Sequence, residues 1–146
     1  MTDAREAILS LMNEYCFRLD AGDMVGCAKL FEHGTWRVLG DPRGGEPGAE
    51  AMMETLKHVI LYDGRPLTKH VMTNVQIEVG PVENWATAQC YITVFQAVPP
   101  DFPLQPIFCG HYRDTFEHAA GKWRFTKRDI APDLIGDLSR HRADMA

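Results

Sequence analysis

The sequence of 146 residues suits one domain with a single hydrophobic core and is too short for two domains of ordinary size. Apolar residues make up 45% and charged residues 24%, which is typical of globular proteins and excludes a fibrous or disordered chain. The net charge is −5 and the basic residues are scattered, so the sequence offers no electrostatic surface for nucleic acid or an anionic membrane.

The N-terminus and the cysteines indicate a cytoplasmic protein. The first six residues carry both charges, and no later apolar run approaches the roughly 18 residues of a membrane span. The cysteines lie far apart without a C-x-x-C pair, which argues against a zinc ribbon, a redox motif or a disulfide framework. We therefore expect one cytoplasmic domain over residues 1–146 whose partner is a small organic molecule.

The first predicted helix starts at residue 4. Apolar residues recur there at three- and four-residue steps and form one buried stripe, which includes Tyr15. The helix is expected to end near Asp20, with Gly22 available for a left-handed cap. Asp20 would then lie at the corner that follows the helix.

Three further elements are expected before the main sheet. Asp23 caps a second short helix that runs to about residue 31, and a short strand follows over residues 33–39. After a loop rich in glycine and proline over residues 40–48, apolar spacing predicts a third helix over about residues 49–61.

Four strand-like segments at hairpin spacing complete the predicted fold, over residues 68–79, 85–98, 106–118 and 122–131. Read with a two-residue period, the first segment has an apolar face that we expect to pack on the core, formed by Val71, Val75, Ile77 and Val79. Its opposite face, which we expect to line a half-polar pocket, carries His70, Met72, Asn74 and Gln76.

The polar tail over residues 132–146 has three alternative interpretations: a short helix, a flap over the pocket, or a frayed terminus. Three helices followed by a curved, mostly antiparallel sheet make an α+β domain. Because the sheet wraps around the helices, it should enclose a cone-shaped pocket.

The order of elements resembles the nuclear-transport-factor-2-like (NTF2-like) superfamily and its SnoaL-like branch. Four spaced motifs resemble the scytalone dehydratase group, which also contains hexachlorocyclohexane dehydrochlorinase and bile-acid 7α-dehydratase. These motifs are Tyr15-(x)4-Asp20-Ala21-Gly22-Asp23, Lys69-His70-(x)3-Asn74, Gly110-His111-Tyr112-Arg113-Asp114-Thr115-Phe116 and Gly121-Lys122-Trp123-Arg124-Phe125-(x)2-Arg128.

This resemblance implies a catalytic dyad of Asp20 and His70, with Tyr15 and Arg128 lining the pocket. It also implies a homo-oligomer, a trimer in the dehydratase group, with a dimer as the alternative. Leu19 stands where scytalone dehydratase has a second pocket tyrosine, which argues against scytalone itself as the substrate.

These residue types suit the elimination of water or HX from a small cyclic or aromatic molecule. His70 would act as general base, and Asp20 would orient its ring and stabilise the imidazolium. Tyr15 would donate a hydrogen bond to a substrate oxygen, and Arg128 would stabilise an enolate or a leaving group. The six histidines are scattered and no glycine-rich phosphate loop is present, so we expect neither a metal nor a cofactor.

Each of the four side chains also has a structural interpretation. The histidine and the tyrosine suit hydrogen-bonded interior positions, the aspartate suits a helix end, and Arg128 suits an ion pair with Asp114 or Asp129. Two alternative functions stay open beside the lyase. One is a ligand-binding or accessory module like the small subunit of ring-hydroxylating dioxygenases, and the other is an enzyme of the ketosteroid isomerase or polyketide cyclase kind.

Overall fold

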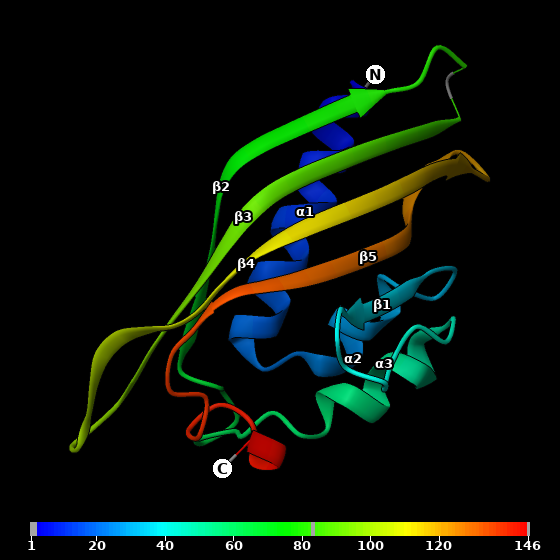
Figure 1. Cartoon of the computed structure of the whole chain (residues 1–146). Coiled ribbons are helices and arrows are strands. Elements are labelled where there is room, and N and C mark those ends of the chain that lie inside the picture. The colour runs from blue at the N-terminus through cyan, green and yellow to red at the C-terminus, as the bar shows by residue number, and fades with distance from the viewer. Residues whose placement is uncertain (1–2, 83, 146) are drawn as a thin grey trace.

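The computed structural model describes residues 3–82 and 84–145, and it has three helices packed on one curved sheet of five strands (Figure 1). The elements in chain order are α1 (Ala4–Ala21), α2 (Met24–Lys29), β1 (Thr35–Val38), α3 (Ala49–Leu56), β2 (Thr68–Val79), β3 (Trp85–Val98), β4 (Phe102–Ala119), β5 (Lys122–Ile135) and a 3-10 turn (Ala143–Met145). The predicted α+β class is confirmed. Within the described residues, no helix combines the length and apolar character that crossing a membrane requires.

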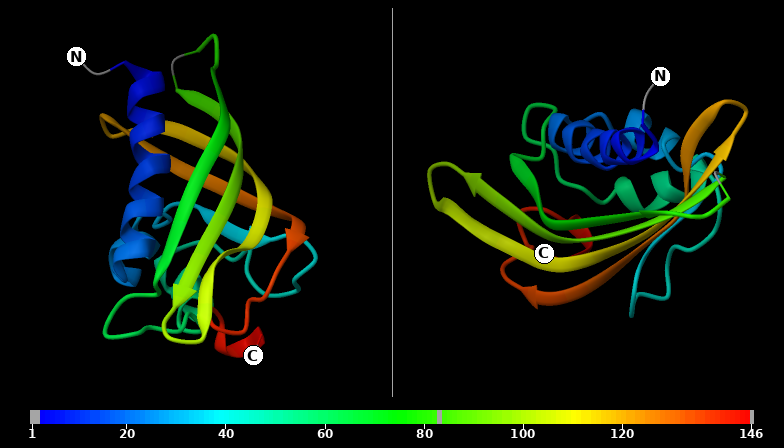
Figure 2. Two further views of the ribbon diagram at one scale, coloured as in Figure 1. Left: turned by 90° about the vertical axis from the view of Figure 1, so that its left-hand side faces the viewer. Right: turned by 90° about the horizontal axis from the view of Figure 1, so that it is seen from above.

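The sheet is open and has the strand order β1-β5-β4-β3-β2. All pairs are antiparallel except β1 with β5, which is parallel. The strands bend strongly and the helices lie on their concave side, as the view from above shows (Figure 2). Helix α1 packs along β2, so a residue near the end of α1 can contact the start of that strand.

The corner after α1 follows the sequence prediction. Gly22 caps the helix with φ 83°. A Cβ at this position would lie 1.9 Å from the carbonyl oxygen of Gly64, so only glycine fits the close approach. The Asp23 side chain then accepts a hydrogen bond from the Gly26 N–H at 2.9 Å and caps α2. Both caps hold the last turn of α1, and with it Asp20, in one position.

The predicted faces of β2 are wrong, because the strand contains a β-bulge. Asn74 has φ 55°, and the pairing with β3 shifts at this point. The extra residue reverses the alternation of side chains, so His70 and Ile77 both face the interior. Val71, expected in the core, is 40% exposed on the outer face. Polar His70 and apolar Ile77 therefore lie on the same, inward-facing side of β2.

Helix α3 is shorter than predicted. It ends at Leu56 rather than near residue 61, although the apolar spacing continues. The chain beyond it pairs with the C-terminal segment instead, which we define as residues 136–145. The Ile60 N–H donates to the His141 carbonyl at 2.9 Å, and Val59 forms a β-bridge with Arg142. These long-range hydrogen bonds take the place of a further helical turn.

Of the three alternatives for the tail, the structure favours the flap. Strand β5 continues to Ile135, and the C-terminal segment then folds back toward α3 (Figure 1). Its backbone is held by side chains of the body: the Arg140 carbonyl accepts hydrogen bonds from the Tyr62 hydroxyl at 2.5 Å and from Gln96 Nε2 at 3.0 Å. The segment is thereby fixed over the open end of the cone.

Candidate active site

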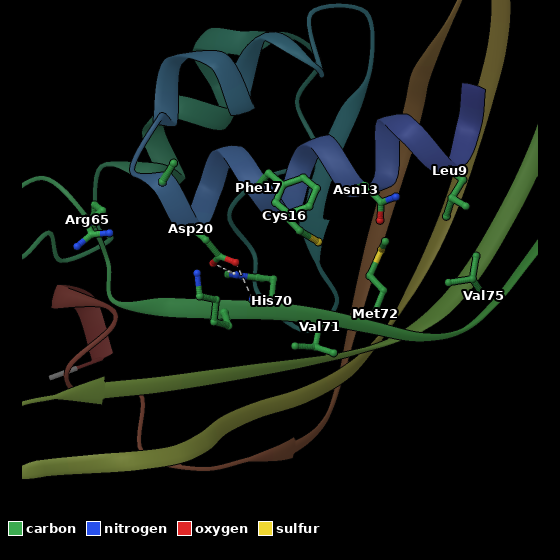
Figure 3. A pocket seen from close by; sticks show the side chains of 12 residues that line it. Leu9, Asn13, Cys16, Phe17, Asp20, Arg65, His70, Val71, Met72 and Val75 are labelled. Carbon is green, nitrogen blue, oxygen red and sulfur yellow. Dashed lines mark hydrogen bonds and ion pairs between the residues drawn. The ribbon is translucent and has the colours of Figure 1, made fainter. Parts of the chain in front are cut away.

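Asp20 and His70, fifty positions apart in the sequence, meet at the contact between α1 and β2 (Figure 3). The distance from His70 Nδ1 to Asp20 Oδ1 is 2.6 Å. The same carboxylate accepts the His70 backbone N–H at 2.8 Å and the Thr68 hydroxyl at 2.7 Å. The side chains of His70 and Asp20 are only 5% and 11% exposed. The structure therefore brings the two predicted dyad residues together in a largely buried position.

The hydrogen bonds determine the charge of Asp20. Burial raises the pKa of this carboxyl, but the hydrogen bonds and the charge interaction with His70, together with the Thr68 hydroxyl, outweigh burial and lower it overall. An ionised carboxylate only accepts hydrogen bonds, so His70 Nδ1 carries the proton that joins the pair. In the neutral ring the lone pair is then on Nε2, and this atom has no hydrogen bond to any residue that the structure describes.

His70 separates two hollows of the molecule. On one side is an open groove of about 650 Å³ between α1 and β2, which Asp20, Arg65 and Lys69 also line. Arg65 lies at the Asp20 end of the groove, and Leu9 and Val75 lie at the opposite end (Figure 3). On the other side is a cavity of about 150 Å³ inside the cone, which Tyr15 also lines. The imidazole of His70 therefore borders both hollows, whereas its partner Asp20 lines only the groove.

Tyr15 lies in the cavity as a neutral hydrogen-bond donor. Its hydroxyl accepts a hydrogen bond from Trp36 Nε1 at 3.0 Å, which leaves its own proton available. Burial raises the pKa of Tyr15 well above its ordinary value, so the phenol stays protonated. Its ring stands perpendicular to that of His70, with 6.4 Å between the centroids. The two side chains can therefore contact one small molecule.

Apart from this polar end, most of the cavity wall is apolar. Apolar residues from α1, β1, α3 and the segment after it, β3, β4, β5 and the C-terminal segment contribute to it, among them Leu19, Val38, Leu56, Val59, Val94, Phe108, Ile130, Ile135 and Leu138. A volume of about 150 Å³ equals that of an engineered apolar cavity that accepts one benzene molecule. The cavity therefore suits a ligand with a single ring.

Arg128 does not line either hollow. It is completely buried and binds Asp114 through two hydrogen bonds of 2.8 Å, which realises one of the two ion pairs expected from the sequence, whereas Asp129 binds another arginine. The guanidinium lies between two rings, 4.3 Å from the centroid of Tyr15 and 3.9 Å from that of Tyr112. Arg128 therefore lies behind Tyr15 and supports it.

Sequence reasoning missed two cavity residues. Tyr112 lies on the same face of β4 as Asp114, and this alternation was a usable signal within the third motif. His141 had no local signal, because it enters the cavity from the C-terminal segment. Burial, then the nearby charges of His70 and Arg142, lower the pKa of His141 to about 4, so its ring is neutral at pH 7.

The mouth of the cavity is bordered by alternating charges. Arg43, in the loop before α3, binds Asp41 at 2.8 Å and Asp144 at 2.7 Å, and Arg142 binds the same Asp144 at 3.0 Å. Hydrogen bonds from Arg142, more than those from Arg43, lower the pKa of Asp144. These pairs join the loop to the C-terminal segment across the opening.

Other reactive side chains do not form a second centre. Burial raises the pKa of Cys16 to about 11 and those of Cys27 and Cys90 to about 12, so these thiols are poor nucleophiles at neutral pH. Among residues 3–82 and 84–145, no group of three or more histidine, cysteine, aspartate or glutamate side chains is arranged to hold a metal ion.

Comparison with known proteins agrees with this architecture. A family model described as a SnoaL-like domain matches residues 1–129. No curated protein matches the sequence. An NTF2-like protein with a cystatin-like fold from Novosphingobium aromaticivorans is 25% identical, with a TM-score of 0.71 over 88% of this chain and 80% of that one.

Two further solved structures are similar. A protein from Novosphingobium aromaticivorans that is provisionally assigned as a scytalone dehydratase is 25% identical, with a TM-score of 0.69 over 89% of this chain and 84% of that one. The hexachlorocyclohexane dehydrochlorinase LinA-type3 from Novosphingobium barchaimii is 19% identical, with a TM-score of 0.71 over 90% of this chain and 88% of that one. The last likeness concerns the fold alone.

Proposed function

Because the chain belongs to the SnoaL-like domain family, we propose that it is a cofactor-independent lyase that eliminates water, or HX, from a small cyclic organic substrate. Because proteins of one fold have many different functions, the evidence for this proposal has to come from the site itself. The observation that carries it is the 2.6 Å contact of His70 Nδ1 with Asp20, in a ring that also lines the cavity. We place the other ring nitrogen, Nε2, toward the cavity. The similarity to the provisionally assigned scytalone dehydratase supports the same class of reaction.

In the proposed reaction, a cyclic hydroxyketone enters the cavity with its acidic C–H bond beside His70 Nε2. The lone pair of Nε2 takes the proton, and the electrons of the C–H bond move toward the neighbouring carbonyl to form an enolate. When the enolate collapses, the C–O bond of the hydroxyl on the next carbon breaks and a C=C bond forms. The departing hydroxyl takes the proton from the imidazolium and leaves as water, which returns His70 to its neutral form.

Asp20 and Tyr15 have separate roles in this proposal. The Asp20 carboxylate stabilises the imidazolium while it exists, and it keeps the ring in the tautomer that presents Nε2 to the cavity. The Tyr15 hydroxyl donates a hydrogen bond to the carbonyl oxygen, which gains charge in the enolate. Arg128 contributes from behind as a positioning residue, because its guanidinium packs on the Tyr15 ring.

The direct test is turnover by His70→Ala. Purified protein is incubated with a panel of alicyclic hydroxyketones, such as 3-hydroxycyclohexanone, and loss of water is followed by mass spectrometry. We expect the variant to lose on the order of 10²–10⁴-fold in kcat, because the general base is gone. His33→Ala is the matched control, since this histidine is exposed and outside the cavity.

Two results would contradict the proposal. Equal turnover by the wild type and His70→Ala would show that the imidazole takes no part. Loss of activity in Asp20→Asn with full activity in His70→Ala would assign the base to the carboxylate, as in the isomerase alternative.

A further inference from the structure

The cavity contains a second imidazole, that of His141, whose Nδ1 atom has no hydrogen-bond partner among the described residues. His141 is 9% exposed, and its Nδ1 atom is buried without a hydrogen bond to any described residue. Its ring lies 6.4 Å from that of His70, centroid to centroid, at an interplanar angle of 62°. Unlike its side chain, the backbone of His141 is well satisfied, since its carbonyl accepts the Ile60 N–H at 2.9 Å. The chain thus holds the residue firmly while its ring is left unpaired.

An unpaired buried imidazole is unusual. Buried polar groups are nearly always hydrogen-bonded, and leaving one unpaired is unfavourable. Because the ring is neutral, it has one N–H donor and one lone pair. A hydroxyl group is the natural complement, since it can donate and accept. The arrangement of His141 is therefore that of a binding group whose partner is a ligand.

The contents of the cavity define which ligand this can be. Most of its wall is apolar, with charged side chains at the mouth and with His70, Tyr15, Tyr112 and His141 as polar side chains inside, so a largely hydrocarbon ligand body fits it. The volume of about 150 Å³ corresponds to one benzene-sized ring. His70, Tyr15 and His141 gather at one region of the wall, so an oxygen on the ring belongs there.

We propose that His141 is a second substrate-contacting residue, which binds the hydroxyl oxygen of a single-ring ligand beside His70. In the elimination, this contact would hold the departing hydroxyl while the His70 imidazolium delivers its proton. The assignment of the hydroxyl as a leaving group rests on the proposed function, whereas the binding of a ring hydroxyl by His141 can be measured without turnover.

Two probes separate ring binding from hydroxyl recognition. Phenol and benzene have the same ring and differ by one hydroxyl, and their dissociation constants are measured by titration calorimetry or ligand-observed NMR. We expect the wild type to bind phenol roughly tenfold more tightly than benzene, which is the contribution of about one hydrogen bond. His141→Leu should bind benzene like the wild type and lose the preference for phenol. His33→Leu is the matched control and should keep it.

Three further variants show which side chain binds the phenol hydroxyl. His70→Ala and Tyr15→Phe should each retain most of the phenol preference if His141 is the main contact. His141→Gln, which restores an amide donor and acceptor, should recover part of it. If His141→Leu does not fold, the wild type still decides the question, because phenol should shift the ring resonances of His141 in NMR spectra and benzene should shift them much less.

Several outcomes would overturn the inference. These are an unchanged phenol preference in His141→Leu, loss of the preference only in Tyr15→Phe or only in His70→Ala, and failure of the wild type to bind either ring at millimolar concentration. If the phenol preference depends on His141 but no hydroxyketone is turned over, the binding role stands and the proposed lyase activity fails. If turnover depends on His70 while the phenol preference does not depend on His141, the proposed lyase activity stands and the binding role fails.

Discussion

At the scale of single residues, the two cavity histidines differ because their partners differ. His70 has an ionised carboxylate 2.6 Å from Nδ1, which holds the ring in one orientation. His141 has no such partner, and it lies against His70 and beside Arg142. One imidazole is therefore suited to take a proton, and the other to remain neutral and bind an oxygen.

The neutral state of His141 has a consequence for stability. Its pKa falls from the ordinary 6.5 to about 4 in the folded protein, so between these values the unfolded chain binds the proton more readily. The folded state therefore loses stability as the pH is lowered through this window, by roughly 3 kcal/mol in total. The groups around the ring that influence this titration are His70, Arg142, Asp20 and Asp144.

We predict that His141→Leu lacks the loss of stability that protonation of His141 causes at low pH. Urea unfolding at pH 7 and pH 4 should show a smaller loss in the free energy of unfolding for His141→Leu than for the wild type. Protonation of the carboxylates destabilises both proteins equally on acidification. The difference between their losses in the free energy of unfolding is therefore due to His141. Identical losses would mean that the ring is already charged or exposed in the folded protein.

At the scale of elements, the bulge in β2 determines what the pocket contains. Without the extra residue, Ile77 and His70 would lie on opposite faces of the sheet. The bulge needs Asn74 at φ 55°, a left-handed conformation that asparagine tolerates and a β-branched residue does not. One exposed residue in this strand thus sets both the core contacts and the position of the imidazole.

Substitution of Asn74 tests this claim. Asn74→Val should lower the free energy of unfolding by roughly 1–2 kcal/mol, because valine is strained at positive φ. Asn74→Gly should be neutral or slightly stabilising, since glycine adopts this conformation freely. The neighbouring exposed position provides the control: Thr73→Val should change stability by less than about 0.5 kcal/mol. Chemical denaturation measures all three, and a harmless Asn74→Val would argue against the bulge.

At the scale of the whole molecule, the enclosure of the cavity limits what can bind. The helices lie on the concave side of the curved sheet (Figure 2). Residues of the sheet, the helices and the C-terminal segment line a cavity of about 150 Å³. Leu138, in the C-terminal segment, forms part of the wall. The segment that supplies His141 therefore also sets the size of the site.

Ring size gives the corresponding prediction. 2-Naphthol, with two fused rings, should bind the wild type at least tenfold more weakly than phenol, because the second ring exceeds the space. Leu138→Ala removes part of the wall and should strengthen 2-naphthol binding while leaving phenol binding within a few fold. Calorimetric titration of both ligands provides the comparison. Equal affinity of the wild type for both would show that the cavity opens readily.

The outer face of the sheet carries exposed apolar side chains, among them Val71 at 40% and Tyr91 at 51%. The two residues lie close together on paired strands, because β2 and β3 pair at Val71 with Thr93 and at Thr73 with Tyr91. Such a face suits contact with further copies of the chain. The homo-oligomer expected from the resemblance stays a prediction.

Much of the fold could be predicted because its signals are local. The caps at Gly22 and Asp23, the periodicity of α1 and the turn residues between strands each reflect the conformations of a few neighbouring residues. The ends of β2 and β3 agree with the predicted ranges, 68–79 and 85–98. The pairing of Asp20 with His70 was also predicted, because the resemblance to the scytalone dehydratase group implied it.

The amino-acid sequence was sufficient for the α+β class and the corner after α1, since short-range backbone preferences encode them, and its resemblance to a known family implied the contact between Asp20 and His70. Only the tertiary structure decided the inward turn of His70 past a bulge, the position of Arg128 behind Tyr15, the early end of α3 and the entry of His141. Each of these depends on hydrogen bonds or packing between segments far apart in the chain, whose free energy outweighs the local pattern.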